Sequence, residues 1–296
     1  MNVPNKIGFF MKDSQSIVQS PMNYIGGKGR LLPQLLPHFP SKIDRFIDVF
    51  SGGANVAANT PTKDIILNDI NFYIMDIIKY FYTVEVLEIL EEIDYYINKY
   101  KLSKHNKEGY LQLRSEYNKS PHPIKLYTLI CHSFNYQFRF NNNHEFNNPF
   151  GKNRSHFSQT LREKLIKFSL RLKEKNILFD TNEFQNFLES FEFQEFDFVY
   201  LDPPYLISTA SYNDGNRGFK NWTVEQEKLL FSVLDQLNNQ NIRFALSNVT
   251  EHKGKKNELL IEWSKKYNVI KLDFSYSNSS HNTKRGHSSE VLITNF

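Results

Sequence analysis

The stretch VYLDPPYLIS, residues 199–208, changes abruptly from apolar residues to an acid and two conformationally restricted prolines. This change gives the first indication of the fold. The stretch continues an apolar run, FDFVYL, and then places an acid, two prolines and a tyrosine at its end. Because proline cannot donate a hydrogen bond to a sheet, Pro203 and Pro204 indicate that a buried strand ends next to Asp202. The same pair would hold Asp202 and Tyr205 rigidly at the carboxyl end of that strand. A purely structural turn with a capping aspartate is the alternative.

Four further short apolar runs, each bounded by turn residues, are typical of buried strands. They are DRFIDVFSGG (44–53), DIILNDIN (64–71), NIRFALSN (241–248) and SEVLITNF (289–296). A helix is predicted before the third of these, with Thr223 as N-cap, Gln226 three residues later and apolar residues at helical spacing up to Leu237. Alternating strands and helices predict an α/β fold with a mostly parallel sheet, in which ligands bind at the carboxyl ends of the strands.

The segment 76–181 has a different pattern. Long helical stretches are predicted at 74–100 and 156–175, and no internal repeat is visible. We therefore predict an inserted, mainly helical domain at 76–181, with the sheet domain formed by 1–75 and 182–296.

The charge of the chain is concentrated in this insertion. Residues 101–180 hold 15 lysines and arginines against 6 aspartates and glutamates, a net charge of +9, while the whole chain carries only +4. Such asymmetry favours a surface that binds a polyanion such as nucleic acid. An ordinary solvated helical face is the alternative.

Composition restricts the class of protein. With 296 residues and 40% hydrophobic content, the chain is large enough to bury a substantial core. Its single cysteine, Cys131, excludes an internal disulfide and a cysteine-cluster zinc site. No apolar run is long enough to span a membrane, and the first residues lack the pattern of a secretory signal. We therefore expect a soluble protein that acts in the cytoplasm.

Residues that follow the first two strands favour a cofactor that contains adenosine. Gly52 and Gly53, after the strand that ends near Asp48, allow a tight turn and a close approach of the backbone to a ligand. Asp69 follows the second strand, 21 residues after Asp48, a spacing typical of an acid that accepts hydrogen bonds from ribose hydroxyls. No G-x-G-x-x-G motif is present to bind a pyrophosphate, so S-adenosylmethionine fits better than NAD.

A second glycine-rich stretch lies upstream. The sequence NYIGGKG places Tyr24 and Lys28 around Gly26 and Gly27, directly before a predicted amphipathic helix. The stretch is consistent either with part of the same ligand site or with a glycine turn followed by an exposed lysine.

The chemistry that suits Asp202 is activation of an aromatic amine. The lone pair of an exocyclic amine on a nucleobase is delocalised into the ring, which makes the nitrogen a poor nucleophile. A carboxylate and the Pro203 carbonyl, held rigidly, could accept its two N–H bonds and favour a nitrogen whose lone pair points at an electrophilic methyl group. Tyr205 could stack on the base, which must leave the duplex to reach such a pocket.

At this point the chain closely resembles the Dam-type, or alpha-group, DNA adenine-N6 methyltransferases of bacteria and phages. The motifs occur in that group's order: NYIGGKG, FIDVFSGGANV, LNDIN, an inserted target-recognition domain, and LDPPYLIS. The resemblance begins near residue 20, and the role of residues 1–19 stays open. It implies a Rossmann-like methyltransferase sheet and transfer of a methyl group from S-adenosylmethionine to adenine N6 in double-stranded DNA, with no metal.

The resemblance also implies roles for individual residues. The DPPY positions Asp202, Pro203, Pro204 and Tyr205 would be catalytic. Ala54 departs mildly from the family, which has a further glycine or other small residue there. The cofactor would contact a larger set: Tyr24, Lys28, Asp48, Phe50, Gly52, Gly53, Asp69 and Asp202.

The Asn-rich stretch 134–153 resembles the family's base-recognition hairpin. The positions that the resemblance assigns to DNA binding are Phe134, Asn135, Gln137, Arg139, Asn141, Pro149 and Lys152. Arginine can donate two hydrogen bonds to guanine in the major groove, so Arg139 is the leading candidate for reading the sequence. A GATC site is the leading hypothesis. Tyr136 and Gln137 differ from many GATC-specific members, which leaves a related or relaxed site open.

Other functions also stay open on the sequence. The chain could methylate cytosine N4, although such enzymes more often carry serine at the position of Asp202. Methylation of RNA or of protein glutamine is a third possibility, and a catalytically silent DNA-binding protein is a fourth. The sequence also leaves open whether the chain belongs to a restriction–modification system, a phage or a housekeeping pathway, and whether it is a monomer or a weak dimer on DNA.

Overall fold

The structure is a computed structural model that describes residues 16–23, 26–207, 222–273 and 288–296. Tyr24 lies outside the described residues. So do residues 208–221, which form most of the stretch between Tyr205 and Trp222.

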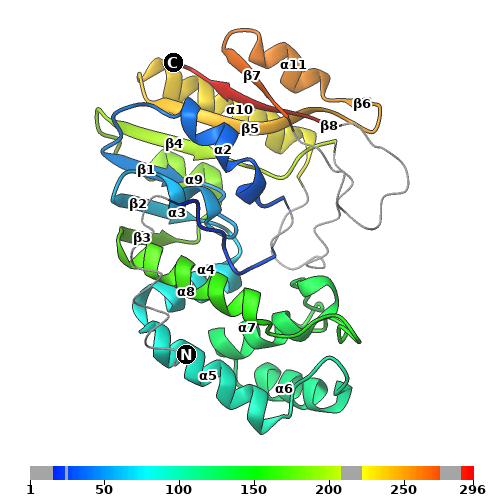
Figure 1. Ribbon diagram of the computed structural model, residues 1–296. Coiled ribbons are helices and arrows are strands. Elements are labelled where there is room, and N and C mark those ends of the chain that lie inside the picture. Colours follow the sequence, from blue (N-terminus) through cyan, green and yellow to red (C-terminus); the bar gives the residue numbers. More distant parts are fainter. Residues whose placement is uncertain (1–15, 24–25, 208–221, 274–287) are drawn as a thin grey trace.

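A single sheet runs through the upper part of the molecule (Figure 1). Its strand order is β3-β2-β1-β4-β5-β8-β7, and β6 pairs only with β5. The strands from β3 to β5 are parallel, whereas β8 runs antiparallel to both β5 and β7. The strands are β1 (Arg45–Asp48), β2 (Asp64–Asn68), β3 (Asn176–Asp180), β4 (Asp197–Leu201), β5 (Arg243–His252), β6 (Lys255–Lys256), β7 (Asn268–Leu272) and β8 (Ser288–Thr294).

The chain order of the strands creates a switch point between β1 and β4. From β1 the chain moves outward through β2 to β3, and it then returns to the other side of β1 to form β4 and β5. Connections therefore leave β1 and β4 in opposite directions, and a crevice opens at their carboxyl ends, where ligands of such sheets bind. The β1 end carries Asp48, and the first residue after β4 is Asp202.

Both faces of the sheet are buried by helices, which explains the continuous apolar runs of its central strands. Neighbouring residues of one strand alternate between two cores, because successive side chains point to opposite faces. Phe46 belongs to the core that is shared with α3 (Asn55–Asn59) and the helical insertion. Ile47 belongs to the core beneath α9 (Phe184–Ser190) and α10 (Val224–Asn239). Further helical elements are η1 (Lys28–Arg30), α2 (Leu32–Leu35), η2 (Leu36–His38) and α11 (Glu258–Ser264).

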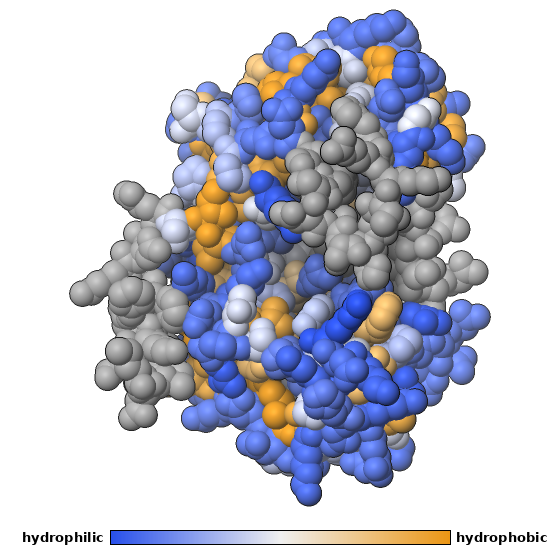
Figure 2. All heavy atoms as spheres, turned by 45° about the vertical axis from the view of Figure 1, so that its right-hand side comes forward, coloured by the Kyte–Doolittle hydropathy of each residue, from blue (hydrophilic) through white to orange (hydrophobic). Residues whose placement is uncertain are grey.

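The helical insertion forms the crossover between β2 and β3. Figure 1 shows its helices below the sheet, and α4 and α8 lie next to it. Figure 2 shows a mostly hydrophilic surface over the lower part of the molecule. The elements are α4 (Phe72–Thr83), α5 (Val86–Lys99), α6 (Lys107–Lys119), α7 (Pro123–His132), η3 (Phe134–Tyr136) and α8 (Gln159–Lys173).

Two details differ from the sequence-based expectation. The helical stretch 74–100 is interrupted, because Val84 and Glu85 adopt extended backbone between α4 and α5. The last part of segment 76–181 contains β3, which pairs with β2 along its whole length and so belongs to the sheet. The division of the chain into a sheet domain and a recognition domain otherwise stays a proposal.

The α/β fold class expected from the sequence is confirmed, with a central, mostly parallel sheet and helices on both of its faces. The helix predicted from Thr223 is confirmed as α10. Its capping box is complete, because the Thr223 side chain accepts from the Gln226 backbone and the Gln226 side chain accepts from the Thr223 backbone. Within the described ranges, no helix has the length and apolar character needed to cross a membrane.

Candidate active site

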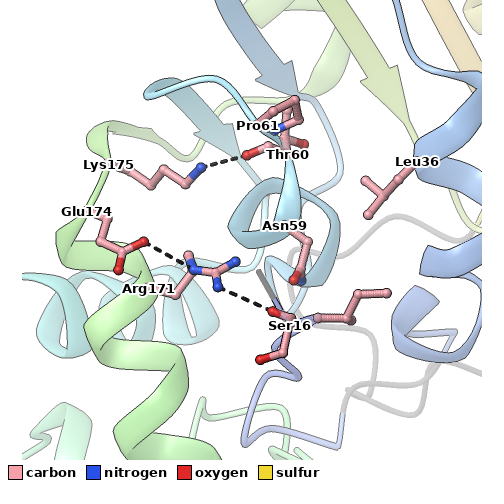
Figure 3. Close-up of a pocket in the computed structure, with 9 residues that line it drawn as sticks. Ser16, Leu36, Asn59, Thr60, Pro61, Arg171, Glu174 and Lys175 are labelled. Atoms are coloured by element: carbon pink, nitrogen blue, oxygen red, sulfur yellow. Dashed lines mark hydrogen bonds and ion pairs between the residues drawn. The ribbon is translucent and has the colours of Figure 1, made fainter. Parts of the chain in front are cut away.

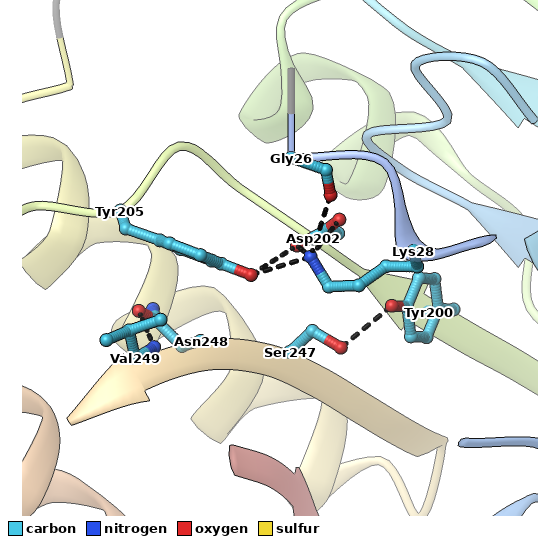
Figure 4. Close-up of polar contacts among 8 residues, drawn as sticks. All are labelled: Gly26, Lys28, Tyr200, Asp202, Tyr205, Ser247, Asn248 and Val249. Carbon is cyan, nitrogen blue, oxygen red and sulfur yellow. Dashed lines mark hydrogen bonds and ion pairs between the residues drawn. The ribbon is translucent and has the colours of Figure 1, made fainter. Parts of the chain in front are cut away.

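The ammonium of Lys28 forms the centre of a polar group at the carboxyl end of β4 (Figure 4). Its Nζ lies 2.6 and 2.7 Å from the two carboxylate oxygens of Asp202, and 2.6 Å from the hydroxyl oxygen of Tyr205. Nζ also donates to the Gly26 carbonyl at 3.1 Å. The Tyr205 hydroxyl donates to Asp202 at 3.1 Å. The structure thus brings residues from two separate motifs into one hydrogen-bonded group.

Local backbone geometry places both partners. The last residue of β4, Leu201, pairs with β5, and the two prolines then prevent the strand from continuing past Asp202. Gly26 has a φ of 82°, a left-handed conformation that favours glycine, and it turns the chain so that Lys28 begins η1 over the end of β4.

Burial controls the charges of this group. The Lys28 side chain is 4% exposed and that of Asp202 is 16% exposed. Loss of water raises the pKa of Asp202, while the charge of Lys28 and hydrogen bonds from Lys28 and Tyr205 act in the opposite direction. Beneath the group, the buried Tyr200 hydroxyl is 2.7 Å from the Ser247 hydroxyl, which links β4 to β5.

Hydrogen bonds to Asp69 connect the turn after β1 to the end of β2. One carboxylate oxygen of Asp69 accepts from the Gly52 N–H at 2.8 Å, and the other accepts from the Asn71 N–H at 2.8 Å. Gly52 has a φ of 45°, and Ala54 a φ of 54°. Ala54 therefore adopts a left-handed conformation that glycine would occupy with less strain.

Asp48 is a buried acid that the fold alone does not satisfy. It is 1% exposed, and its Oδ1 has no hydrogen-bond partner among the described residues. Burial raises the pKa of Asp48 well above its usual range, and the negative charges of Asp202 and Asp69 add to this effect, while Lys28 opposes it. A cationic or hydrogen-bond-donating ligand group beside Asp48 would remove this cost.

Three aromatic rings gather at the same edge of the sheet. Phe50 follows β1, Phe184 begins α9, and Trp222 precedes α10. Ring centroids are 5.5 Å apart for Phe50 and Phe184, 5.8 Å for Phe50 and Trp222, and 5.7 Å for Phe184 and Trp222. Such a cluster offers apolar faces to a planar ligand. Sequence reasoning identified Phe50 only, since no local motif marks the other two.

The stretch 134–153 forms a loop closed by two isolated antiparallel bridges, Ser133–Phe150 and Phe140–Phe146. Asn148 fastens its base, because its Nδ2 donates to the carbonyls of Phe134 and Gln137 at 3.1 and 2.9 Å. This buried asparagine was absent from the predicted set.

The predicted DNA-contact residues fall into two groups. The side chains of one group are exposed, and they are Phe134, Arg139, Pro149 and Lys152. The second group is partly buried, and there Asn141 is committed to the loop itself: its side chain accepts from two backbone N–H groups and donates to Glu145. The carbonyl of Asn135 accepts from Asn23, which ties the loop to the stretch that contains Lys28.

A separate pocket of about 270 Å³ lies between the end of α8 and the residues that follow α3 (Figure 3). Its cationic side chains are engaged: Lys175 donates to the Thr60 carbonyl, and Arg171 pairs with Glu174 and donates to the Ser16 carbonyl. The pocket contains none of the predicted site residues. Within the described part of the chain, no group of three or more His, Cys, Asp or Glu side chains is arranged to hold a metal ion.

Comparison with known proteins agrees with this geometry. A family model described as D12 class N6 adenine-specific DNA methyltransferase matches residues 24–278, and the chain therefore belongs to this family. The resemblance predicted from the sequence motifs is confirmed.

Several curated proteins are similar to the chain. It is 55% identical over 283 residues to "Type II methyltransferase M.FokI" of Planomicrobium okeanokoites and 50% identical over 288 residues to "Modification methylase StsI" of Streptococcus sanguinis. These matches cover 96% and 97% of this chain but only 44% of each relative, so the chain spans less than half of their length. It is also 26% identical to a "DNA adenine methylase" of Escherichia coli K12, with 89% of this chain and 91% of that protein covered.

Proposed function

We propose that the chain transfers a methyl group from S-adenosylmethionine to N6 of an adenine in double-stranded DNA. One observation carries the proposal: the largely shielded carboxylate of Asp202, fixed at the switch point of the sheet, accepts N–H bonds from a nitrogen through both of its oxygens. The amine of a target base presents the same kind of donor.

The residues around Asp202 suit this reaction. Asp202 and the Pro203 carbonyl would accept the two N–H bonds of the adenine amine, which favours a nitrogen lone pair directed away from the ring plane. The amine would replace one of the bonds that Lys28 now donates, so Lys28 must shift when the base enters. Tyr205 would stack on the base, which must swing out of the duplex to reach this edge of the sheet.

The described residues fit S-adenosylmethionine, whose sulfonium supplies the electrophilic methyl group when it is bound. The Oδ1 atom of Asp48, which has no hydrogen-bond partner among the described residues, suits the cationic amino end of the cofactor. Asp69 follows β2, and its spacing from Asp48 suits an acid that contacts ribose hydroxyls. The aromatic cluster of Phe50, Phe184 and Trp222 offers a surface for the adenine ring.

The helical insertion would bind the DNA. Residues 101–180 carry a net charge of +9, and exposed basic side chains such as Arg139 and Lys152 suit contacts to phosphates and base edges. We infer that Arg139 reads guanine in a GATC or related short site. We also infer that the enzyme serves a restriction–modification system, because two similar proteins are named a "Type II methyltransferase" and a "Modification methylase". Adenine is favoured over cytosine by membership of an adenine-specific family.

Transfer of tritiated methyl groups from S-adenosylmethionine tests the proposal. The wild-type chain should label adenine-containing duplex DNA and leave RNA and peptides unlabelled, and nucleoside analysis should find the label on adenine N6 rather than cytosine N4. Asp202→Ala should reduce the rate by at least about a hundredfold, because the group that orients the amine is lost. Sequencing of methylated bases in a host that expresses the chain would identify the recognition site.

Asp235→Ala is a matched control. It removes a carboxylate of the same type that pairs with Trp263 and Lys266, away from the site, so its rate should stay near that of the wild type. Full activity of Asp202→Ala under these conditions would reject the proposed chemistry.

A further inference from the structure

Glu227, in the first turn of α10, is an acid without access to water: it is 0% exposed. Its carboxylate accepts three side-chain hydrogen bonds. Oε2 accepts from the indole N–H of Trp222 at 2.5 Å, and Oε1 accepts from the amides of Asn257 and Asn248 at 2.9 and 3.4 Å. One carboxylate thus joins the segment before α10, the middle of β5 and the N-cap of α11.

The three donors cannot reverse their roles. The Asn257 carbonyl oxygen is used by the Leu260 N–H at 3.1 Å, and that of Asn248 by the Val249 N–H at 2.7 Å, so both amides must present their NH₂ groups to Glu227. An indole can only donate. The position therefore requires a group that accepts at both oxygens, which an ionised carboxylate does and an amide does not. Burial raises the pKa of Glu227, and the three donors oppose that rise.

The indole held by Glu227 is a wall of the aromatic cluster. Trp222 meets the Phe50 ring edge-on, at an interplanar angle of 82°, and lies tilted against Phe184. A charge-assisted hydrogen bond to Glu227 therefore fixes the indole N–H of Trp222. The ring itself packs against Phe50 and Phe184, in the cluster that would receive the cofactor.

Asn248, which donates to Glu227, lies near the part of the site that contains Asp202 and Tyr205. Leu246 is the last β5 residue paired with β4, opposite Leu201, and Asn248 is two residues further along. Asn248 therefore lies on β5 at the level of the turn that carries Asp202 and Tyr205, and Figure 4 shows it in the same region as the Tyr205 ring.

We propose that Glu227 is a positioning residue, which sets the affinity for S-adenosylmethionine by holding the Trp222 indole against the aromatic cluster. The inference rests on the proposed function for its ligand, but it concerns a residue that does not touch the reacting atoms. A glutamine at this position can keep both asparagine bonds only if its NH₂ group points at the indole N–H. The Trp222 bond is then lost while the shape is conserved.

The test uses the full chain and two kinds of measurement. Glu227→Gln should raise the Kd of S-adenosylmethionine, measured by calorimetry, and its KM by about tenfold, the size of one hydrogen bond to a charged group. The kcat at saturating cofactor and the KM for DNA should stay within about twofold. Trp222→Phe should have a similar effect, and the double variant should be no weaker than the weaker single variant, because both changes break the same bond.

A spectroscopic arm needs no activity. The chain has two tryptophans, so Trp263→Phe leaves Trp222 as the sole tryptophan reporter. In that background, Glu227→Gln should shift the emission to longer wavelength and increase quenching by acrylamide. Asp235→Asn, in the chain with both tryptophans, is the matched control: it alters the equivalent indole–carboxylate bond of Trp263, at 2.9 Å, and should leave cofactor affinity unchanged.

The outcomes separate the two ideas. If the wild-type chain neither binds S-adenosylmethionine nor methylates DNA, the proposed function fails, and the cofactor role of Glu227 fails with it. If the wild type does both while Glu227→Gln keeps its cofactor affinity, the inference alone is overturned. Additive losses in the double variant would overturn it too. Should Glu227→Gln not fold, Trp222→Phe decides, and wild-type affinity in that variant overturns the inference.

Discussion

Replacement of Lys28 by methionine gives a direct measure of the group at the centre of the site. The substitution keeps the apolar stem and removes an ammonium that donates to Asp202, Tyr205 and the Gly26 carbonyl. Removing one partner of a buried ion pair costs about 3–5 kcal/mol, because the other charge stays in a poorly solvated place. We expect the lower end, about 3 kcal/mol, since Asp202 is 16% exposed and keeps its bond from Tyr205.

The cost should depend on pH in a defined direction. Burial already raises the pKa of Asp202, and loss of the Lys28 charge in Lys28→Met raises it further. A carboxyl group whose pKa is higher in the folded than in the unfolded state destabilises the fold once it ionises, and this penalty grows as pH rises up to the folded pKa. The penalty of Lys28→Met is therefore largest at pH 8 and shrinks as pH falls through the raised pKa of Asp202.

Urea unfolding at pH 8 and pH 5 measures the free energy of unfolding and its pH dependence. It should be applied to the wild type, Lys28→Met, Asp202→Asn and the double variant. The double variant should lose about 2 kcal/mol less than the sum of the single losses, because it leaves no uncompensated charge. The reasoning is refuted if Lys28→Met unfolds with wild-type stability at pH 8, if its cost is the same at both pH values, or if the two losses add.

Two further results are expected. Asp48→Asn should stabilise the cofactor-free chain by about 2 kcal/mol at pH 8 and by almost nothing at pH 4, because burial penalises the ionised form of Asp48. Thermal unfolding at both pH values checks this. The gain in stability should be accompanied by weaker binding of S-adenosylmethionine. Arg139→Ala should lower discrimination between cognate and altered sites by about 1–3 kcal/mol, whereas Lys152→Ala should weaken binding to all sequences and reduce the log–log salt slope by about 0.9. DNA titrations at several salt concentrations separate these two, and equal sequence discrimination by both variants would contradict the role of Arg139.

The central strands could be identified from neighbouring residues alone. Strands β1, β2 and β4 are covered on both faces, so apolar residues fill the interior of each strand, and the polar residues and prolines that end them stand out. The edge strands lack this signal. In β3, Leu178 is 69% exposed, and in β7 Val269 is 44% exposed, so their short mixed sequences do not distinguish them from loops.

The residues of the candidate active site also divide into those that the sequence indicates and those that only the folded structure shows. Short sequence motifs contain Asp69, Lys28 and Asp202, because each of them directly follows a strand or a glycine turn. The apolar or glycine residues that form that strand or turn are neighbours in the sequence, so the motif can be recognised without the structure. The contact between Lys28 and Asp202 spans 174 positions of the chain, and it depends on the order in which the strands are laid side by side. Local sequence sets backbone conformation and burial pattern over a few residues, whereas the strand order follows from how all the apolar surfaces are buried together. The aromatic cluster and the carboxylate of Glu227 could for that reason be seen only in the folded chain.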